Sequence, residues 1–240
     1  MEPHEPQGRP EPSATGGDAS LPRPLERLRY RLPVIASLAA IGVLYLLVSE
    51  RLTLGPSWLP LATVAVLILV AIVELTQEPN PAAIRVATLV VTSALTLAIA
   101  ASTVLLVGIL VTGGLPGIAL LQGAGIIWVA NLLTFAVWYW EIDGGGPLER
   151  RRTGPGPADF LFPQYTISHA SARRAARRQT KPWTPEFVDY FFLAFNTSSA
   201  FSPTDTLTLS RRAKILMMIQ STISLLTVAV LAARAINILR

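Results

Sequence analysis

Five long and almost uncharged apolar runs constrain this sequence more than any other feature. They cover residues 32–49, 58–75, 84–111, 118–140 and 215–233. About 20 apolar residues are enough for a helix to cross the hydrocarbon core of a bilayer. Only 15% of the 240 residues are charged, against roughly 25% in soluble domains. The sequence therefore predicts an all-α membrane protein with about five transmembrane helices.

The remaining segments divide the chain into four parts. Residues 1–24 are rich in Pro, Gly, Ser and charge and contain no aromatic residue, which predicts a disordered tail. Residues 25–141 hold the first four apolar runs. Residues 142–182 form a basic connection, and residues 183–240 combine a short apolar segment, a polar loop and the last span. Because the first apolar run begins only after residue 31, we expect a retained membrane helix rather than a cleaved signal peptide.

The Arg and Lys residues are distributed unevenly among the connections. They gather before the first apolar run and in residues 142–182, whereas the loops at 50–57 and 112–117 hold only Arg51. Within the second of these loops, GGLP at 113–116 is expected to make a tight turn. Positive residues favour the cytoplasmic side of a membrane. The pattern predicts a multi-pass protein of the plasma (inner) membrane with its N-terminus in the cytoplasm.

The basic connection itself has two parts. Residues 143–157 are rich in Gly and Pro and are expected to form a loop, whereas residues 168–179 are able to form a helix. Four arginines share one face of that helix: Arg173, Arg174, Arg177 and Arg178. Two interpretations stay open, docking on anionic lipid headgroups or a purely topological role.

A polar stretch separates a short aromatic segment from the last apolar run. It consists of Asn196, Thr197, Ser198, Ser199, Ala200, Phe201, Ser202, Pro203, Thr204 and Asp205. Polar backbone is permitted at membrane depth only where protein or a water-filled cavity surrounds it. We therefore expect a short re-entrant or interfacial helix, a polar loop over residues 198–205, and then the last membrane helix. Asp205 and Ser210 are both candidate caps of that helix.

This order of elements resembles the pore module of bacterial potassium channels. An alignment without gaps from Tyr190 places the selectivity filter on residues 198–203, with Phe201 at the filter tyrosine and Arg212 at the family's arginine. A filter must direct its carbonyl oxygens at the ion, and glycine permits the backbone conformations that this uses. Ala200 and Ser202 stand in place of those glycines. The resemblance therefore implies a channel-like module with a degenerate filter.

A second resemblance covers most of residues 25–240. GGGP at 144–147, DFLFPQ at 159–164 and AFSPTDTLTLSRRAK at 200–214 are similar to an uncharacterised family of actinobacterial integral membrane proteins. This resemblance implies a bacterial membrane protein and brings no activity with it.

Polar residues inside the apolar runs are candidate functional residues. Gln220, Ser224 and Thr227 lie on one face of the last helix, and Asn131 and Thr134 lie close together on the fourth. These side chains either line a hydrophilic path or form hydrogen bonds between helices, and typical membrane packing favours the second interpretation.

Several classes of function find no support in the sequence. The chain has no Cys and two widely separated His residues, and it lacks the common catalytic and phosphate-binding motifs. We expect no enzyme activity, cofactor, metal or nucleic-acid partner. A third hypothesis is an intramembrane hydrolase, for which Asp189 and Asp205 would form a paired acid site. The sequence favours a non-catalytic membrane scaffold with a channel-like module. The alternative is an oligomeric ion channel or transporter with residues 196–205 near its constriction, and the expected partners are membrane lipids and copies of the chain.

Overall fold

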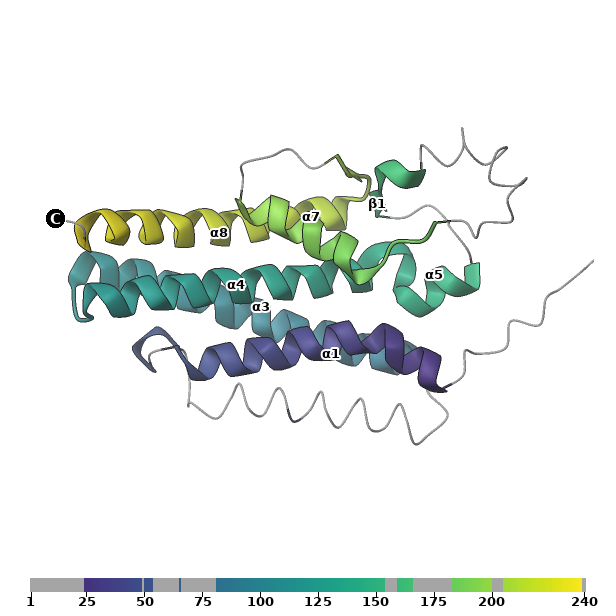
Figure 1. The fold of residues 1–240 in the computed structure, drawn as a ribbon, viewed down its shortest axis with the longest axis horizontal. Coiled ribbons are helices and arrows are strands. Elements are labelled where there is room, and N and C mark those ends of the chain that lie inside the picture. Colours follow the sequence, from purple (N-terminus) through teal and green to yellow (C-terminus); the bar gives the residue numbers. More distant parts are fainter. Residues whose placement is uncertain are drawn as a thin grey trace, which may run out of the picture.

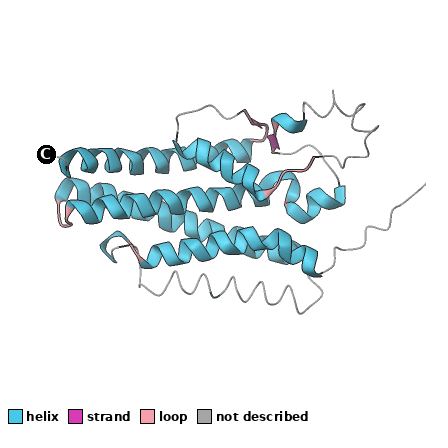
Figure 2. Ribbon diagram, in the orientation of Figure 1, coloured by secondary structure: helices cyan, strands magenta, loops and turns pink. Residues whose placement is uncertain are grey.

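Long helices lying side by side dominate the computed structural model, which describes residues 24–48, 50–53, 65, 81–153, 159–165, 183–199 and 205–238. Helices α1 (Pro24–Leu46), α3 (Pro81–Thr112), α4 (Gly117–Ile142) and α8 (Arg211–Ile238) run along the long axis of the bundle (Figure 1). The shorter helix α7 (Phe187–Ser199) lies beside α4 and α8. Figure 2 shows that helix makes up nearly all of the described chain.

Three of these helices are long and apolar enough to cross a membrane. They are Ala82–Thr112, Gly117–Gly145 and Arg211–Ile236, which places this chain among membrane proteins. The predicted helices at 84–111, 118–140 and 215–233 are thereby confirmed as helices. The first apolar run lies in α1, whose apolar part, Arg31–Leu46, is shorter. Apart from Ala65, the run at 58–75 lies outside the described residues.

Most hydroxyl groups within α3 are satisfied by the helix itself. Thr88, Thr92 and Thr103 each donate a hydrogen bond to the carbonyl oxygen four residues earlier, at 3.1, 2.6 and 2.9 Å. A hydroxyl group that faces hydrocarbon without a partner is costly. These local bonds explain how a membrane helix accommodates so many Ser and Thr residues.

The predicted turn at residues 113–116 is confirmed. Gly113 and Gly114 have φ angles of 82° and 116°, a region that favours glycine, and the amide of Gly113 donates to the carbonyl of Ile109 at 2.9 Å. This is a common way to end a helix. The short 3-10 helix η1 (Glu50–Leu52) is fixed here, because Arg51 Nη1 donates to the carbonyl of Gly114 at 2.6 Å.

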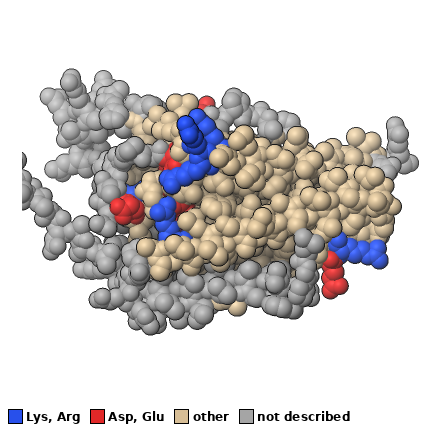
Figure 3. Space-filling model, turned by 180° about the vertical axis from the view of Figure 1, so that it is seen from behind, with Lys and Arg blue, Asp and Glu red and all other residues tan. Residues whose placement is uncertain are grey.

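Charged side chains lie toward the two ends of the bundle. On the face drawn in Figure 3, a band of uncharged residues separates them. Helix α3 has no charged residue after Arg85, α4 has none before Glu141, and α8 has none between Lys214 and Arg234. We call the end that carries Arg31, Arg85, Glu141 and Arg212 the polar end, and the end with the α3–α4 turn the far end.

The segment after α4 differs from the predicted loop. Residues 143–157 were expected to form a Gly/Pro loop, but η2 (Asp143–Gly145) and helix α5 (Pro147–Thr153) occupy residues 143–153. The expectation fails because a proline is well suited to the first position of a helix, and LERRR after Pro147 contains good helix formers.

A two-stranded pairing at the polar end was not predicted either. Strand β1 (Phe160–Leu161) runs antiparallel to β2 (Leu207–Thr208), with Phe160 opposite Thr208.

The expected capping of the last helix by Asp205 is wrong. Helix α8 begins only at Arg211, and the hydroxyl of Ser210 accepts the amide of Ala213 at 3.2 Å. Ser210, the other candidate, is therefore the cap.

Candidate functional site

Gln220 is the centre of a buried polar cluster between three helices. It lies in the third turn of α8 and is fully buried. Its Nε2 donates to the carbonyl of Ala194 at 2.8 Å and to Ser198 Oγ at 2.7 Å, and its Oε1 accepts the hydroxyl of Tyr139. One side chain therefore joins α4, α7 and α8.

The predicted polar face of α8 continues from Gln220 into the bundle. Asn131 Nδ2, on α4, donates to Ser224 Oγ at 2.9 Å and to the carbonyl of Gln220 at 3.3 Å. Thr227 is also buried, and its hydroxyl donates to carbonyl groups of α8. The structure brings Gln220, Ser224 and Asn131 together, while the Thr134 hydroxyl on α4 is buried without a hydrogen-bond partner among the described residues.

Two aspartates form a second cluster at the polar end. Asp143 Oδ1 accepts the amides of Asp159 and Phe160 at 2.7 and 3.2 Å, and its Oδ2 accepts the hydroxyl of Tyr190 at 2.5 Å. Asp159 in turn receives two hydrogen bonds from Arg212, from Nε at 2.6 Å and from Nη2 at 2.5 Å. These bonds tie the end of α4, β1, α7 and the start of α8 to one another.

The electrostatics of Asp159 follow from this geometry. Burial on its own raises the pKa of this carboxyl group. The hydrogen bonds and the positive charge of Arg212 outweigh burial, so the pKa of Asp159 falls below its usual value. A bidentate Arg–carboxylate contact is among the stronger polar contacts in proteins. Asp159 therefore remains ionised and keeps Arg212 in place.

Three consecutive glycines allow the chain to turn sharply after α4. Gly144, Gly145 and Gly146 have φ angles of 55°, 86° and 99°, which favour glycine over other residues. A Cβ atom on Gly146 would also lie 3.4 Å from the backbone oxygen of Glu141. The turn brings Arg150, on α5, back against the end of α4.

Arg150 then packs against two aromatic rings that also contact each other. Its Nη1 donates to the carbonyls of Trp140 and Asp143 at 2.9 and 2.5 Å. Its guanidinium carbon lies 4.7 Å from the ring centre of Trp140 and 5.1 Å from that of Tyr190. Such cation–π contacts stabilise a partly desolvated arginine. Arg150 thus anchors α5 to α4 and α7.

The polar end also contains a buried ion pair. Arg31 Nη1, on α1, donates to Glu141 Oε1 on α4 at 2.6 Å, and both side chains are almost completely buried. Removing one partner of such a pair leaves an uncompensated charge, which destabilises a protein by roughly 3–5 kcal/mol. The pair fixes α1 to α4.

Sequence reasoning missed these contacts although it had identified several of the residues. Arg31 and Arg150 were interpreted as topology signals, and Arg212 through the resemblance to channels. The sequence did contain a signal for these contacts, because the acidic residues Glu141 and Asp143 follow the fourth apolar run on the side where the arginines lie. Sequence spacing did not indicate which arginine meets which acid.

The other predicted site residues lie in different places. Asn196, Thr197, Ser198 and Ser199 form the last turn of α7, so the expected loop begins later than residue 198. Residues 200–204 and the four arginines Arg173, Arg174, Arg177 and Arg178 lie outside the described residues. Asp205 lies at an exposed bend, whereas Asp189 accepts the amide of Glu186 at 2.7 Å.

No group of three or more His, Asp or Glu side chains in the described part of the chain is placed to hold a metal ion. Comparison of the chain with protein-family models, with curated proteins and with solved structures gives no match. The arguments about function therefore rest on the geometry described above.

Proposed function

We propose that this protein is a non-catalytic membrane scaffold in which a short helix is held against a bundle of longer helices by polar contacts. The observation that carries the proposal is Gln220, whose amide nitrogen and oxygen are all bonded within one chain. A side chain that lines a conducting path leaves polar atoms free for water or ions. Gln220 instead uses its polar atoms to hold α7 against α4 and α8.

The charged residues of the polar end support the same proposal. Arg212 meets Asp159, and Arg31 meets Glu141, in each case on a different element. Their charges are balanced inside the chain rather than directed at a common open site. Such pairs hold elements in register, which suits a scaffold.

We also propose that the polar end faces the cytoplasm from the inner membrane of a bacterium. Support comes from the arginines at this end and in residues 142–182, because positive residues favour the cytoplasmic side. Since the chain has no Cys, single cysteines test the orientation cleanly. An impermeant thiol reagent applied to intact cells should label Glu50→Cys at the far end and leave Leu209→Cys unlabelled. The opposite labelling pattern would reverse the orientation.

A second candidate function is an oligomeric ion channel or transporter with residues 196–205 near its constriction. The observation in its favour is the position of Ser198, at the C-terminal turn of α7, which lies beside the third turn of α8. The C-terminal end of a helix carries partial negative charge, and such an end inside the bundle would stabilise a cation.

One variant distinguishes the two functions. Copies of Ser199 converge on a symmetry axis in the channel but are held apart in the scaffold. Under mild oxidation in liposomes, the scaffold predicts that Ser199→Cys runs as a single chain on a non-reducing gel. It also predicts that wild-type liposomes pass potassium, sodium and protons no faster than protein-free liposomes.

The Cys-free wild type is the control for the oxidation. A chain-to-chain disulfide at Ser199→Cys together with a selective cation flux that oxidation changes would overturn the scaffold in favour of the channel.

A further inference from the structure

Helix α7 has two faces of opposite character. Its inner face carries Tyr190, Ala194 and Ser198, which are buried against α4 and α8. Its outer face carries Val188, Phe192 and Phe195, with 63%, 63% and 43% of each residue's surface exposed. Charged residues occur only near the start of the helix, where Asp189 lies, and residues 190–199 carry none.

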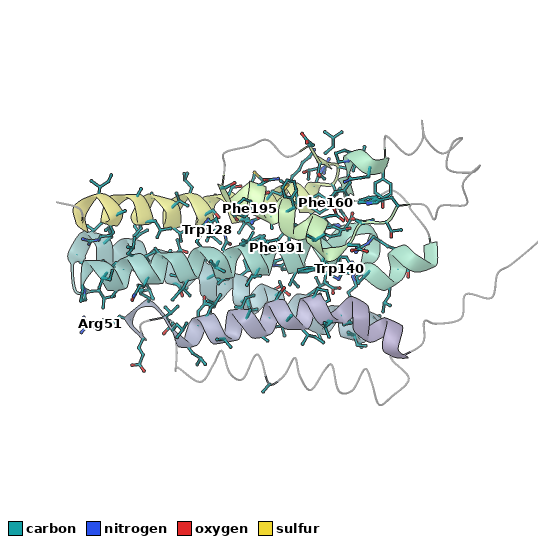
Figure 4. All side chains as sticks on the ribbon, viewed as in Figure 1. Arg51, Trp128, Trp140, Phe160, Phe191 and Phe195 are labelled. Carbon is teal, nitrogen blue, oxygen red and sulfur yellow. The ribbon has the colours of Figure 1, made fainter. Side chains whose placement is uncertain are left out.

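The ring contacts of α7 show how far it extends along the bundle. At its start, Phe187 packs against Trp140 with ring centres 5.8 Å apart, and farther on Phe195 packs against Trp128 at 6.1 Å. Figure 4 shows Trp140 near the polar end and Trp128 with Phe195 nearer the middle of the bundle. Twelve residues of α4 separate the two tryptophans, a distance of about 18 Å at 1.5 Å per residue. Since the hydrocarbon core is about 30 Å thick, α7 covers the depth of about one leaflet.

The chain enters and leaves this region at the same end. Tyr190, in the first turn of α7, bonds Asp143 at the polar end, and Ser198 bonds Gln220 deep in α8. Residues 207 and 208 then pair with β1, which lies beside Asp159, again at the polar end. An element of this kind is inserted from one side and does not cross.

We propose that the outer face of α7 is a lipid-contacting surface, and that α7 penetrates the acyl chains of the leaflet on the side of the polar end. The surface is continuous with the exposed apolar face of α8 at the same level, where Ile215 and Met218 are 52% and 61% exposed. This inference rests on the scaffold proposed above. In the channel, Ser199 would face the symmetry axis, and it lies on the same stripe of α7 as Phe192 and Phe195.

The composition of the outer face fits fluid acyl chains better than a second protein helix. Helix contacts within membranes are enriched in small residues and in polar groups that bond across the interface. The exposed row of α7 consists of one Val and two Phe, with neither feature. The polar groups of α7 at Ser198 and Thr197 instead bond residues of this chain. Acyl chains are therefore the occupant that we assign.

Spin labelling of the full-length protein in liposomes tests the inference. With no native Cys, labels go on Val188→Cys, Phe192→Cys and Phe195→Cys, one at a time. Collision with dissolved oxygen, which concentrates in acyl chains, is compared with collision with a water-soluble nickel chelate. Leu97→Cys, exposed in the middle of α3, is the lipid reference, and Leu207→Cys, exposed on β2, is the aqueous reference.

The oxygen-to-nickel ratio at Phe192→Cys should exceed the aqueous reference several-fold and stay below that of Leu97→Cys, which lies deeper in the membrane. The ratio should also rise from Val188→Cys through Phe192→Cys to Phe195→Cys, because the helix deepens. A constant ratio along the row would mean that α7 lies on the membrane surface, and a ratio like that of Leu207→Cys would mean that it lies in water.

Low collision rates with both reagents, together with spin–spin broadening, would mean that a second copy covers the face. Each of these three results overturns the proposal. Val188 and Phe192 are largely exposed, so their substitution leaves the core intact, and these two positions decide the outcome even if Phe195→Cys unfolds the protein.

Discussion

Replacing Gln220 by Leu should loosen the attachment of α7 more than any other single uncharged substitution in α8. The change removes the hydrogen bonds to Ala194 and Ser198 and the acceptor of the Tyr139 hydroxyl. A hydrogen bond between membrane helices contributes about 0.6 kcal/mol on average. A buried group left without its partner costs about 1–3 kcal/mol.

Since two bonds to α7 are lost and the buried Tyr139 hydroxyl also loses its acceptor, we expect Gln220→Leu to lower the free energy of unfolding by about 2–4 kcal/mol. The measurement is a titration of the purified protein with a denaturing detergent in mixed micelles, followed by tryptophan fluorescence. Trp128 and Trp140 both contact α7, so the fluorescence responds to its release.

Two further variants make the result specific to the Gln220 contacts. Thr222→Val lies on the exposed side of the same helix and removes only a bond to the carbonyl of Met218, so it should change stability by less than about 0.5 kcal/mol. Tyr139→Phe combined with Gln220→Leu should be less damaging than the sum of the two single changes, because no polar atom of that pair is then left unpaired. If Gln220→Leu unfolds at the same detergent fraction as the wild type, the proposed attachment of α7 is refuted.

Three further predictions address the polar end and the basic connection. Ser210→Ala should lower the free energy of unfolding by about 0.5–2 kcal/mol because it removes the cap of α8, whereas Asp205→Ala should leave it unchanged. Thermal denaturation measures both variants, and a larger loss of stability in Asp205→Ala than in Ser210→Ala would assign the cap to Asp205. The pKa of Asp159 is lowered in the folded protein. Its contact with Arg212 therefore makes its full contribution to the stability of the folded protein above the pKa of an aspartate in the unfolded chain, about 3.9. That contribution is lost as the pH falls through the pKa of Asp159 in the folded protein. In melting curves recorded at a series of pH values, the melting temperature should therefore fall less at low pH in Asp159→Asn than in the wild type. An equal fall in both proteins would contradict the contact. Finally, changing the four arginines at 173, 174, 177 and 178 to Gln should weaken binding of the reconstituted protein to anionic lipid, and unchanged binding with unchanged salt sensitivity would leave them only a topological role.

The sequence by itself determined the long helices of this protein. The runs at 84–111, 118–140 and 215–233 appear as α3, α4 and α8, and the glycines at 113 and 114 make the expected turn. These features depend on local causes: a helix satisfies its own backbone groups inside a membrane, and glycine tolerates positive φ. The short helix before the last span followed from its apolar composition in the same way. The position at which this helix ends, Ser199, did not follow from composition. Polar residues continue the helix because their hydroxyl groups bond the preceding turn.

Only the tertiary structure decided which polar groups meet. Gln220 and Tyr139 are 81 positions apart, and Arg212 and Asp159 are 53 apart. Such pairings depend on how helices lie against one another, and the spacing of residues along one helix carries no information about its neighbours. The same holds for β1 and β2, whose two residues each are too few to produce a sequence pattern. Strand β1 is held in place because Asp143 accepts the amides of Asp159 and Phe160, and β2 pairs with β1. The Asp143 contact exists only once α4 has placed its last turn beside β1.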